Sequence, residues 1–259
     1  MELLIDYITS FVRVYLIFLL GYYLIPVGLV YFVFFIWKRR KWNYKRIQSK
    51  FPVIQSIKRE VSWSLLALAI FAFMTVFMLE FINKGYTRIY FDMHEFGIFY
   101  LFVSPLIAIV LHDTYYYWMH RAMHHRLLFR HTHKVHHQSI NPTPWAIYAF
   151  QPLEAIFTYF SFAFAIFVIP MHPYALGFYL LISLVNNVGG HTGFEILPRW
   201  VVKNKLARYS NVVTFHDQHH TDFNCNYGAY FNIWDRIMKT VHKDFEKKFF
   251  EVKNRKPSP

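Results

Sequence analysis

Long apolar runs are the feature that most restricts how this chain of 259 residues can fold. Residues 11–37 and 61–82 are almost entirely apolar, and a third run begins near residue 96 and stays apolar to residue 111. About 20 consecutive apolar residues cross the hydrocarbon core of a bilayer as one helix. We therefore expect transmembrane helices. Buried helices of a soluble protein are less favoured, because only 17% of the residues are charged, against about 25% in soluble domains.

Two shorter apolar segments follow, residues 153–170 and residues 173–188, separated by the brief link Met171–His172. Each is marginal in length for a full crossing, so the pair is expected either to span the membrane or to dip into it as a hairpin. In both cases its two ends emerge on the same face. A proline at position 26 predicts a kink in the first run. The first residues lack the basic region of a signal peptide, so we expect the first span to be retained as an anchor.

Basic residues predict the orientation of the chain in the membrane. Residues 37–60, 120–150, 190–210 and 230–259 carry nine, four, four and eight Lys and Arg, which is 25 of the 28 in the chain. The positive-inside rule places such segments in the cytoplasm, and residues 83–96 are then expected outside. The formal net charge of +13 is explained by this topology and by attraction to anionic lipid heads. No nucleic acid is expected as a partner, because no RNA- or DNA-binding motif accompanies the charge.

The predicted fold is therefore an all-α integral membrane protein. We expect four to five transmembrane or membrane-embedded helices and a histidine-rich helical cap on the cytoplasmic side. The whole chain, residues 1–259, is expected to form a single membrane domain.

Histidine is the unusual residue type, with 15 in the chain, and nine of them are clustered on the predicted cytoplasmic side. Two of the nine are four residues apart at the end of the third run, so one helix face presents both rings. Two H-x-x-H-H boxes follow, and one further histidine stands where the fifth apolar segment ends. The nine residues are His120, His124, His133, His136, His137, His191, His216, His219 and His220. His112 is ambiguous, because it lies about 80° away from His120 on an ideal helix.

Imidazole-rich sets of this kind favour Zn, Cu, Fe or Ni, whereas Mg and Ca prefer oxygen ligands. Nine imidazoles exceed what one ion can use, so we expect two metal ions. Carboxylates that accept the second ring N–H of a ligand are expected nearby, and the candidates are Asp113, Asp217 and Asp235. A single cysteine, Cys225, excludes a zinc site built from cysteines.

Motifs within about residues 105–240 resemble the fatty acid hydroxylase/sterol desaturase superfamily. They are the stretches His112–His125, His133–His137, Asn141–Trp145, Gln151–Glu154, His216–His220, Asn226–Gly228 and Trp234–Arg236. The stretch His191–Gly193 is similar to the H-x-G element of sterol methyl oxidase and hydroxylase members. Gln151 stands where many relatives have histidine, so this position is not an imidazole ligand here.

The resemblance implies that residues 105–240 form a catalytic region with a cytosol-facing dimetal centre. It implies two Fe ions as the cofactor, O₂ as the oxidant, and electrons from a separate carrier of the cytochrome b5, ferredoxin or reductase type. The substrate is then a sterol, a fatty acyl chain or a related apolar lipid from the bilayer, which is hydroxylated or desaturated. Zinc has no accessible redox change, but it can replace iron in recombinant protein because it binds nitrogen ligands more tightly than ferrous iron.

Two other functions stay open at this point. A membrane zinc-dependent lipid hydrolase could use the same histidines without O₂. A metal transporter is less favoured, since its polar ligands would be expected in the middle of the spans. The multi-pass chain is expected to place its active site on the cytoplasmic face of a bacterial cytoplasmic membrane, or of the endoplasmic reticulum if the organism is eukaryotic.

Overall fold

The computed structural model describes residues 1–257, which form helices and connecting loops with no β-strand among them. Three helices in this described part of the chain are long and apolar enough to cross a membrane. They are the first helix, Glu2–Trp37, together with α3 (Ile54–Asn83) and α4 (Gly97–Met123). The prediction of an all-α membrane protein is therefore confirmed, while the number of further membrane-embedded helices stays a prediction.

The first helix passes Pro26 without a break. It consists of α1 (Glu2–Ile17), η1 (Phe18–Leu24), α2 (Ile25–Tyr31) and η2 (Phe32–Trp37), of which η1 and η2 are π-helical. A proline inside an α-helix lacks its N–H and presses its ring against the carbonyl four residues earlier. The π-helical turn that precedes Pro26 changes the hydrogen-bond register, so the helix accommodates the ring.

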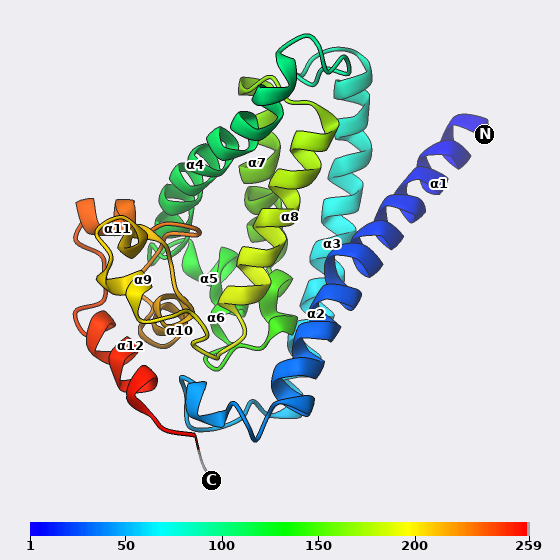
Figure 1. The fold of residues 1–259 in the computed structure, drawn as a ribbon. Helices are drawn as coiled ribbons and strands as arrows, with labels where there is room; N and C mark the ends of the chain where they lie inside the picture. The colour runs from blue at the N-terminus through cyan, green and yellow to red at the C-terminus, as the bar shows by residue number, and fades with distance from the viewer. Residues whose placement is uncertain (258–259) are drawn as a thin grey trace.

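The long helices pack side by side as a bundle (Figure 1). α3 packs along α1 and against α7 (Pro152–Val168), and α4 packs on both α7 and α8 (Pro173–Gly190). The link between α7 and α8 meets the loop between α3 and α4, since Met171 N donates to Arg88 O at 3.0 Å and Arg88 N donates to Ile166 O at 2.7 Å. The tip of the α7–α8 hairpin therefore reaches the end of the bundle opposite the histidine motifs.

Short helices at the other end of the bundle form a cap. They are η3 (Asn43–Lys45), α5 (Phe129–Thr132), α6 (Lys134–His137), η4 (Pro144–Tyr148), α9 (Trp200–Lys203), η5 (Ala207–Tyr209), α10 (Val213–Asp222), α11 (Ile233–Ile237) and α12 (Phe245–Asn254). The basic segment after the first helix is fastened to the cap, because Ile47 N donates to Gly193 O at 3.0 Å and Glu195 N donates to Lys45 O at 2.8 Å.

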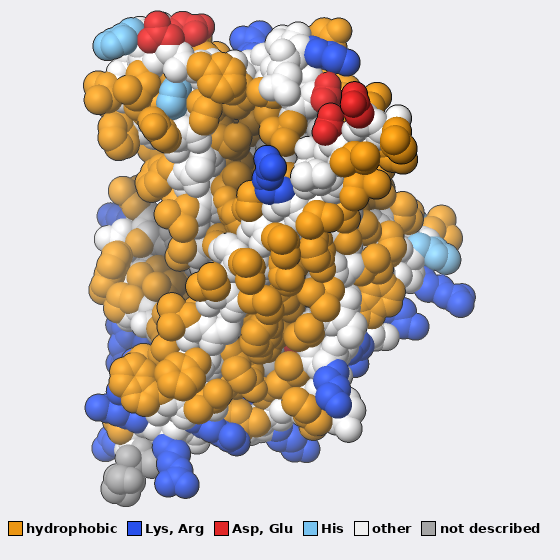
Figure 2. All heavy atoms as spheres, turned by 90° about the vertical axis from the view of Figure 1, so that its right-hand side faces the viewer, with side chains coloured by type: hydrophobic (Ala, Val, Ile, Leu, Met, Phe, Trp, Pro, Cys, Tyr) orange, Lys and Arg blue, Asp and Glu red, His pale blue; other side chains and the backbone are white. Residues whose placement is uncertain are grey.

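The surface charge follows this division. Lys and Arg gather at the cap end of the face shown in Figure 2, and apolar side chains cover most of the surface between that end and the opposite one. The amino terminus lies at the end away from the cap (Figure 1). An apolar band with a basic end is the arrangement that a membrane protein with a cytoplasmic cap requires.

We expect reporter fusions after residue 90 and at the carboxyl terminus to report opposite sides of the membrane. The loop at residue 90 lies beside the hairpin tip, whereas the carboxyl terminus follows the basic cap. Agreement between the two reporters would contradict the predicted topology.

Candidate metal centre

All nine histidines singled out from the sequence converge in the cap, where they form two groups. The five-histidine cluster consists of His120, His124, His133, His137 and His219. The four-histidine cluster consists of His136, His191, His216 and His220. Within each cluster the nitrogens that could bind an ion lie within 4.8 Å of one another. Four distant parts of the chain contribute histidines to the site. They are α4, the α5–α6 segment, the end of α8, and α10.

In the five-histidine cluster, ring nitrogens face one another. His120 Nδ1 donates to the carbonyl oxygen of Tyr227 at 2.8 Å, and His133 Nδ1 lies 2.6 Å from Glu154 Oε1. A neutral imidazole has one N–H and one lone pair, so Nε2 of His120 carries a lone pair, and Nε2 of His133 carries one when Glu154 accepts from Nδ1. These two Nε2 atoms are only 2.9 Å apart. A cation bound between them would be held by both rings.

The four-histidine cluster repeats the arrangement. His191 Nδ1 donates to the carbonyl oxygen of Asn187 at 2.9 Å, which leaves its Nε2 as an acceptor. This Nε2 lies 3.1 Å from Nε2 of His216, which in turn lies 3.1 Å from Nε2 of His220. In both clusters the ring nitrogens thus gather closely enough to bind one ion.

The donor set and its spacing fit metal binding. Two nitrogens that bind one ion at about 2.0–2.1 Å lie roughly 3.0–3.4 Å from each other. The Nε2–Nε2 distances in the two clusters are 2.9–3.1 Å, close to that range. Since imidazole suits Fe, Zn, Cu and Ni rather than Mg or Ca, each cluster could hold one transition-metal ion.

Burial keeps the rings in the form that binds metal. Desolvation lowers the pKa of His191 to about 4 and the pKa of His137 to about 3. The pKa values of His216, His219 and His220 lie well below the ordinary value, mainly because of desolvation and further because neighbouring rings would repel a second positive charge. These imidazoles are therefore neutral at pH 7, with a lone pair available.

Backbone carbonyls and one buried glutamate orient the rings. Besides the carbonyls of Tyr227 and Asn187, the carbonyl of Cys225 accepts from His219 Nδ1 at 2.7 Å. Among the described residues, Glu154 is the only carboxylate that contacts one of the nine rings, and it is 1% exposed. Sequence reasoning missed Glu154 as a ring partner, although its motif was part of the family resemblance. Its position on the first turn of α7 could have pointed to it.

The three aspartates predicted to contact ligand rings bind other groups instead. Asp113 accepts from the backbone N–H groups of residues 230 and 231, at 2.7 and 3.1 Å. Asp217 accepts from the amide of Gln48 at 2.9 Å. Asp235 accepts from two backbone N–H groups and from the hydroxyl of Thr240. The predicted contact between these aspartates and the ligand rings was therefore wrong. Proximity in the sequence does not show which group reaches a ring, and in this site backbone carbonyls reach the rings first.

Asp235 nevertheless supports the site through the backbone. Its two carboxylate oxygens each lie 2.8 Å from a backbone nitrogen, those of Tyr227 and Gly228, and the Tyr227 carbonyl holds His120. A Cβ atom at Gly228 would lie 2.1 Å from the carbonyl oxygen of Phe231. Only glycine therefore fits at position 228, which explains the glycine of the Asn226–Gly228 motif.

The remaining histidines lie outside both clusters. His125 is exposed, His172 caps α8 by accepting from Tyr174 N, and His242 binds the amide of Gln218 at 3.0 Å. Gln151 is no ligand either. Its Oε1 accepts from Val135 N at 3.2 Å, which fixes the segment that carries three of the nine histidines.

A cavity of about 280 Å³ adjoins the four-histidine cluster. His136, His191 and His216 form part of its wall, while no member of the five-histidine cluster lines it. Much of the rest of the wall is apolar, with Phe150, Phe162, Val185, Ile196, Leu197 and Val212. A molecule in this cavity would therefore meet only one of the two clusters.

Comparison with known proteins assigns the family. A model of the fatty acid hydroxylase family matches residues 105–240, more than half of the chain. The chain belongs to this family. The predicted membership of the fatty acid hydroxylase/sterol desaturase superfamily is thereby confirmed.

Two of the relatives that this chain matches are named as sterol enzymes. Human lathosterol oxidase is 34% identical over 186 residues, which cover 70% of this chain and 60% of the relative. A Delta(7)-sterol 5(6)-desaturase of Gibberella zeae is 30% identical over 216 residues, 82% of this chain and 63% of the relative. The chain thus spans about 60% of the length of these relatives. No solved structure gives a significant match.

We expect about two metal ions per chain, and the loss of one histidine should lower this number. His120→Ala, His136→Ala and His219→Ala each remove an imidazole from a cluster, whereas His125→Ala changes an exposed ring outside both. Elemental analysis of the purified variants measures the effect. Full metal content in any of the first three would show that the residue is not an essential ligand.

Glu154→Gln is expected to weaken metal retention by about 10–100-fold, the usual cost of removing a partner of a ligand ring. The substitution keeps the size of the side chain but replaces the carboxyl group beside His133 with an amide. Chelator competition measures the affinity, with the exposed Glu246→Gln as the matched control. Equal affinity for the variant and the wild type would mean that Glu154 has only a packing role.

Proposed function

We propose that this chain is a membrane-bound oxidoreductase that hydroxylates or desaturates a lipid with O₂, using two iron ions held by the two histidine clusters. The observation that carries the proposal is the convergence of nine imidazoles on two points, one of them beside a cavity. Family membership supports it, as do relatives whose names describe sterol oxidation and desaturation.

Bound iron would supply the reduction of O₂ and the removal of hydrogen from an unactivated C–H bond, with electrons from an external carrier. The residues of the chain have the remaining tasks of holding the ions, placing one C–H bond and excluding water. The five-histidine cluster offers five nitrogens and does not reach the cavity. The four-histidine cluster offers four and lines it, so it is the cluster that the substrate would approach.

Residues next to the four-histidine cluster tie the site to the bundle. The carbonyl of Asn187 holds His191, and the side-chain amide of Asn187 donates to Ile147 O at 3.3 Å. Asn187 also lines the cavity. The last turns of α8 thus position a candidate ligand and shape the substrate space at the same time, which favours a fixed geometry between substrate and metal.

The electron carrier and the location of the protein are further parts of the proposal. The basic cap would attract an acidic carrier of the cytochrome b5, ferredoxin or reductase type, since complementary charge speeds association. The relatives named above are eukaryotic, so they lend no support to the bacterial cytoplasmic membrane, which stays a prediction from the sequence.

The decisive test is lipid mass spectrometry on membranes that contain the iron-loaded protein and an electron donor. We expect an O₂-dependent lipid product that has gained one oxygen atom or lost two hydrogen atoms. His219→Ala should abolish this product, and His125→Ala should leave it unchanged. Hydrolysis of a lipid by the zinc-loaded protein without O₂ would instead favour a zinc hydrolase, and metal uptake into vesicles would favour a transporter.

A further inference from the structure

His112 belongs to neither cluster, yet it is buried and surrounded by hydroxyl groups. Its Nδ1 lies 2.8 Å from the hydroxyl of Tyr179 and 2.9 Å from the hydroxyl of Tyr230. Its Nε2 lies 3.1 Å from Ser161 Oγ, and Tyr230 donates to Ser183 Oγ at 2.6 Å. Residues of α4, α7, α8 and the loop after α10 therefore form one polar network inside an otherwise apolar bundle.

This network forms part of the cavity wall that also carries the four-histidine cluster. His112, Ser183 and Tyr230 line the cavity, and so does Thr158. The Oγ1 atom of Thr158 is buried without a hydrogen-bond partner among the described residues, and the side chain is only 5% exposed. A buried hydroxyl with no partner costs free energy. A polar atom of a molecule in the cavity could satisfy it.

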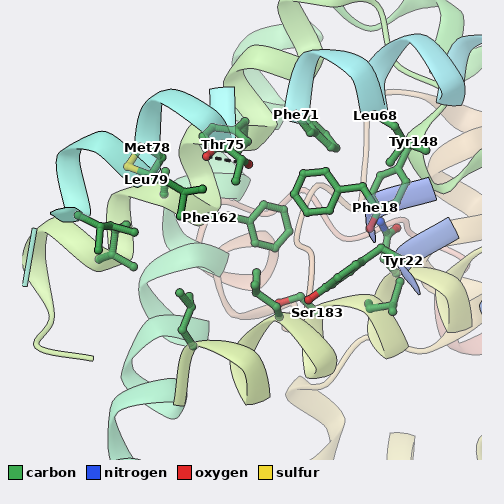
Figure 3. A pocket seen from close by; sticks show the side chains of 18 residues that line it. Phe18, Tyr22, Leu68, Phe71, Thr75, Met78, Leu79, Tyr148, Phe162 and Ser183 are labelled. Carbon is green, nitrogen blue, oxygen red and sulfur yellow. Dashed lines mark hydrogen bonds between the residues drawn. The ribbon is translucent and has the colours of Figure 1, made fainter. Parts of the chain in front are cut away.

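An apolar chamber of about 250 Å³ adjoins the cavity. Phe162, Ser183 and Asn187 line both spaces, and the chamber extends from there between the first helix, α3, α7 and α8. In Figure 3, the ring of Phe162 lies between Met78 and Leu79 of α3 on one side and Phe18 of the first helix on the other. The two spaces together suit a long molecule that has its polar group near Ser183.

Charge is missing from both spaces. Among the described residues that line the cavity and the chamber, none is Lys, Arg, Asp or Glu. A carboxylate or a phosphate held by the network would find no Lys or Arg side chain to pair with, and the only positive charge on the cavity wall would be the ion proposed at the four-histidine cluster. The hydroxyl groups of the network therefore favour an uncharged polar group that both donates and accepts hydrogen bonds.

We infer that Thr158, Ser183, Tyr230 and His112 form a binding site for the hydroxyl group of an uncharged lipid alcohol. A hydroxyl group donates one hydrogen bond and accepts others, which matches a cavity wall that carries the unpartnered hydroxyl of Thr158 together with the hydroxyls of Tyr230 and Ser183. The apolar body of the ligand extends into the chamber. If the proposed oxidation holds, the reacting carbon lies closer to the hydroxyl end than to the apolar end, because the hydroxyl site and the four-histidine cluster share one cavity.

The test measures binding rather than turnover. Full-length protein in lipid nanodiscs is titrated with cholestanol and with cholestane, which lacks the hydroxyl group, in competition with radiolabelled cholestanol. The wild type should bind cholestanol roughly tenfold more tightly. Thr158→Val and Tyr230→Phe should each reduce this preference by roughly fivefold, the usual effect of one hydrogen bond. Binding of cholestane should stay the same.

Thr158→Val separates a ligand role from a structural one. Because the Thr158 hydroxyl has no hydrogen-bond partner among residues 1–257, its removal should leave the melting temperature unchanged or raise it. Thr9→Val, on the exposed face of α1, is the matched control and should keep the full preference for cholestanol. Equal binding of cholestanol and cholestane by the wild type, or an unchanged preference in both cavity variants, would overturn the inference. Neither result would bear on O₂-dependent lipid oxidation, which is measured separately.

Discussion

The cap is organised around buried imidazole nitrogens that lie close enough together to share a cation. Nε2 of His120 and Nε2 of His133 lie 2.9 Å apart, in surroundings where desolvation keeps nearby rings neutral. Such an arrangement favours an ion, because metal binding requires deprotonated ligands. The remaining features of the cap serve to hold these rings at close range.

The rings are held mainly by loops, so the loops must be held in turn. The carbonyls of Tyr227 and Cys225 each fix a ring, and both belong to the turn around Asn226. Asn226 has a φ of 58°, a left-handed conformation that asparagine tolerates better than most residues, and its side-chain amide donates to Phe215 O at 2.8 Å. Asp235 binds the next two backbone N–H groups. These two polar residues near the histidines thus bind the backbone that holds the rings, and they do not contact the rings themselves.

The bundle gives the two clusters different surroundings. The four-histidine cluster borders a cavity that leads to an apolar chamber among the membrane helices, whereas no member of the five-histidine cluster lines either space. A molecule in the cavity would therefore meet an ion at the four-histidine cluster first. Because α7 and α8 form both the chamber wall and part of the site, the helices that accept a lipid also place it relative to the histidines.

The sequence by itself determined the class of the protein and the identity of the nine histidines. Apolar runs longer than the bilayer core leave few alternatives to membrane helices, and repeated spacings such as His216, His219 and His220 place rings on one helix face. The division into two clusters, the role of Glu154 and the hydroxyl network around His112 were decided only by the tertiary structure. Each of these depends on contacts between residues far apart in the chain, and spacing along one helix carries no information about which distant carbonyl, carboxylate or hydroxyl will reach a given ring.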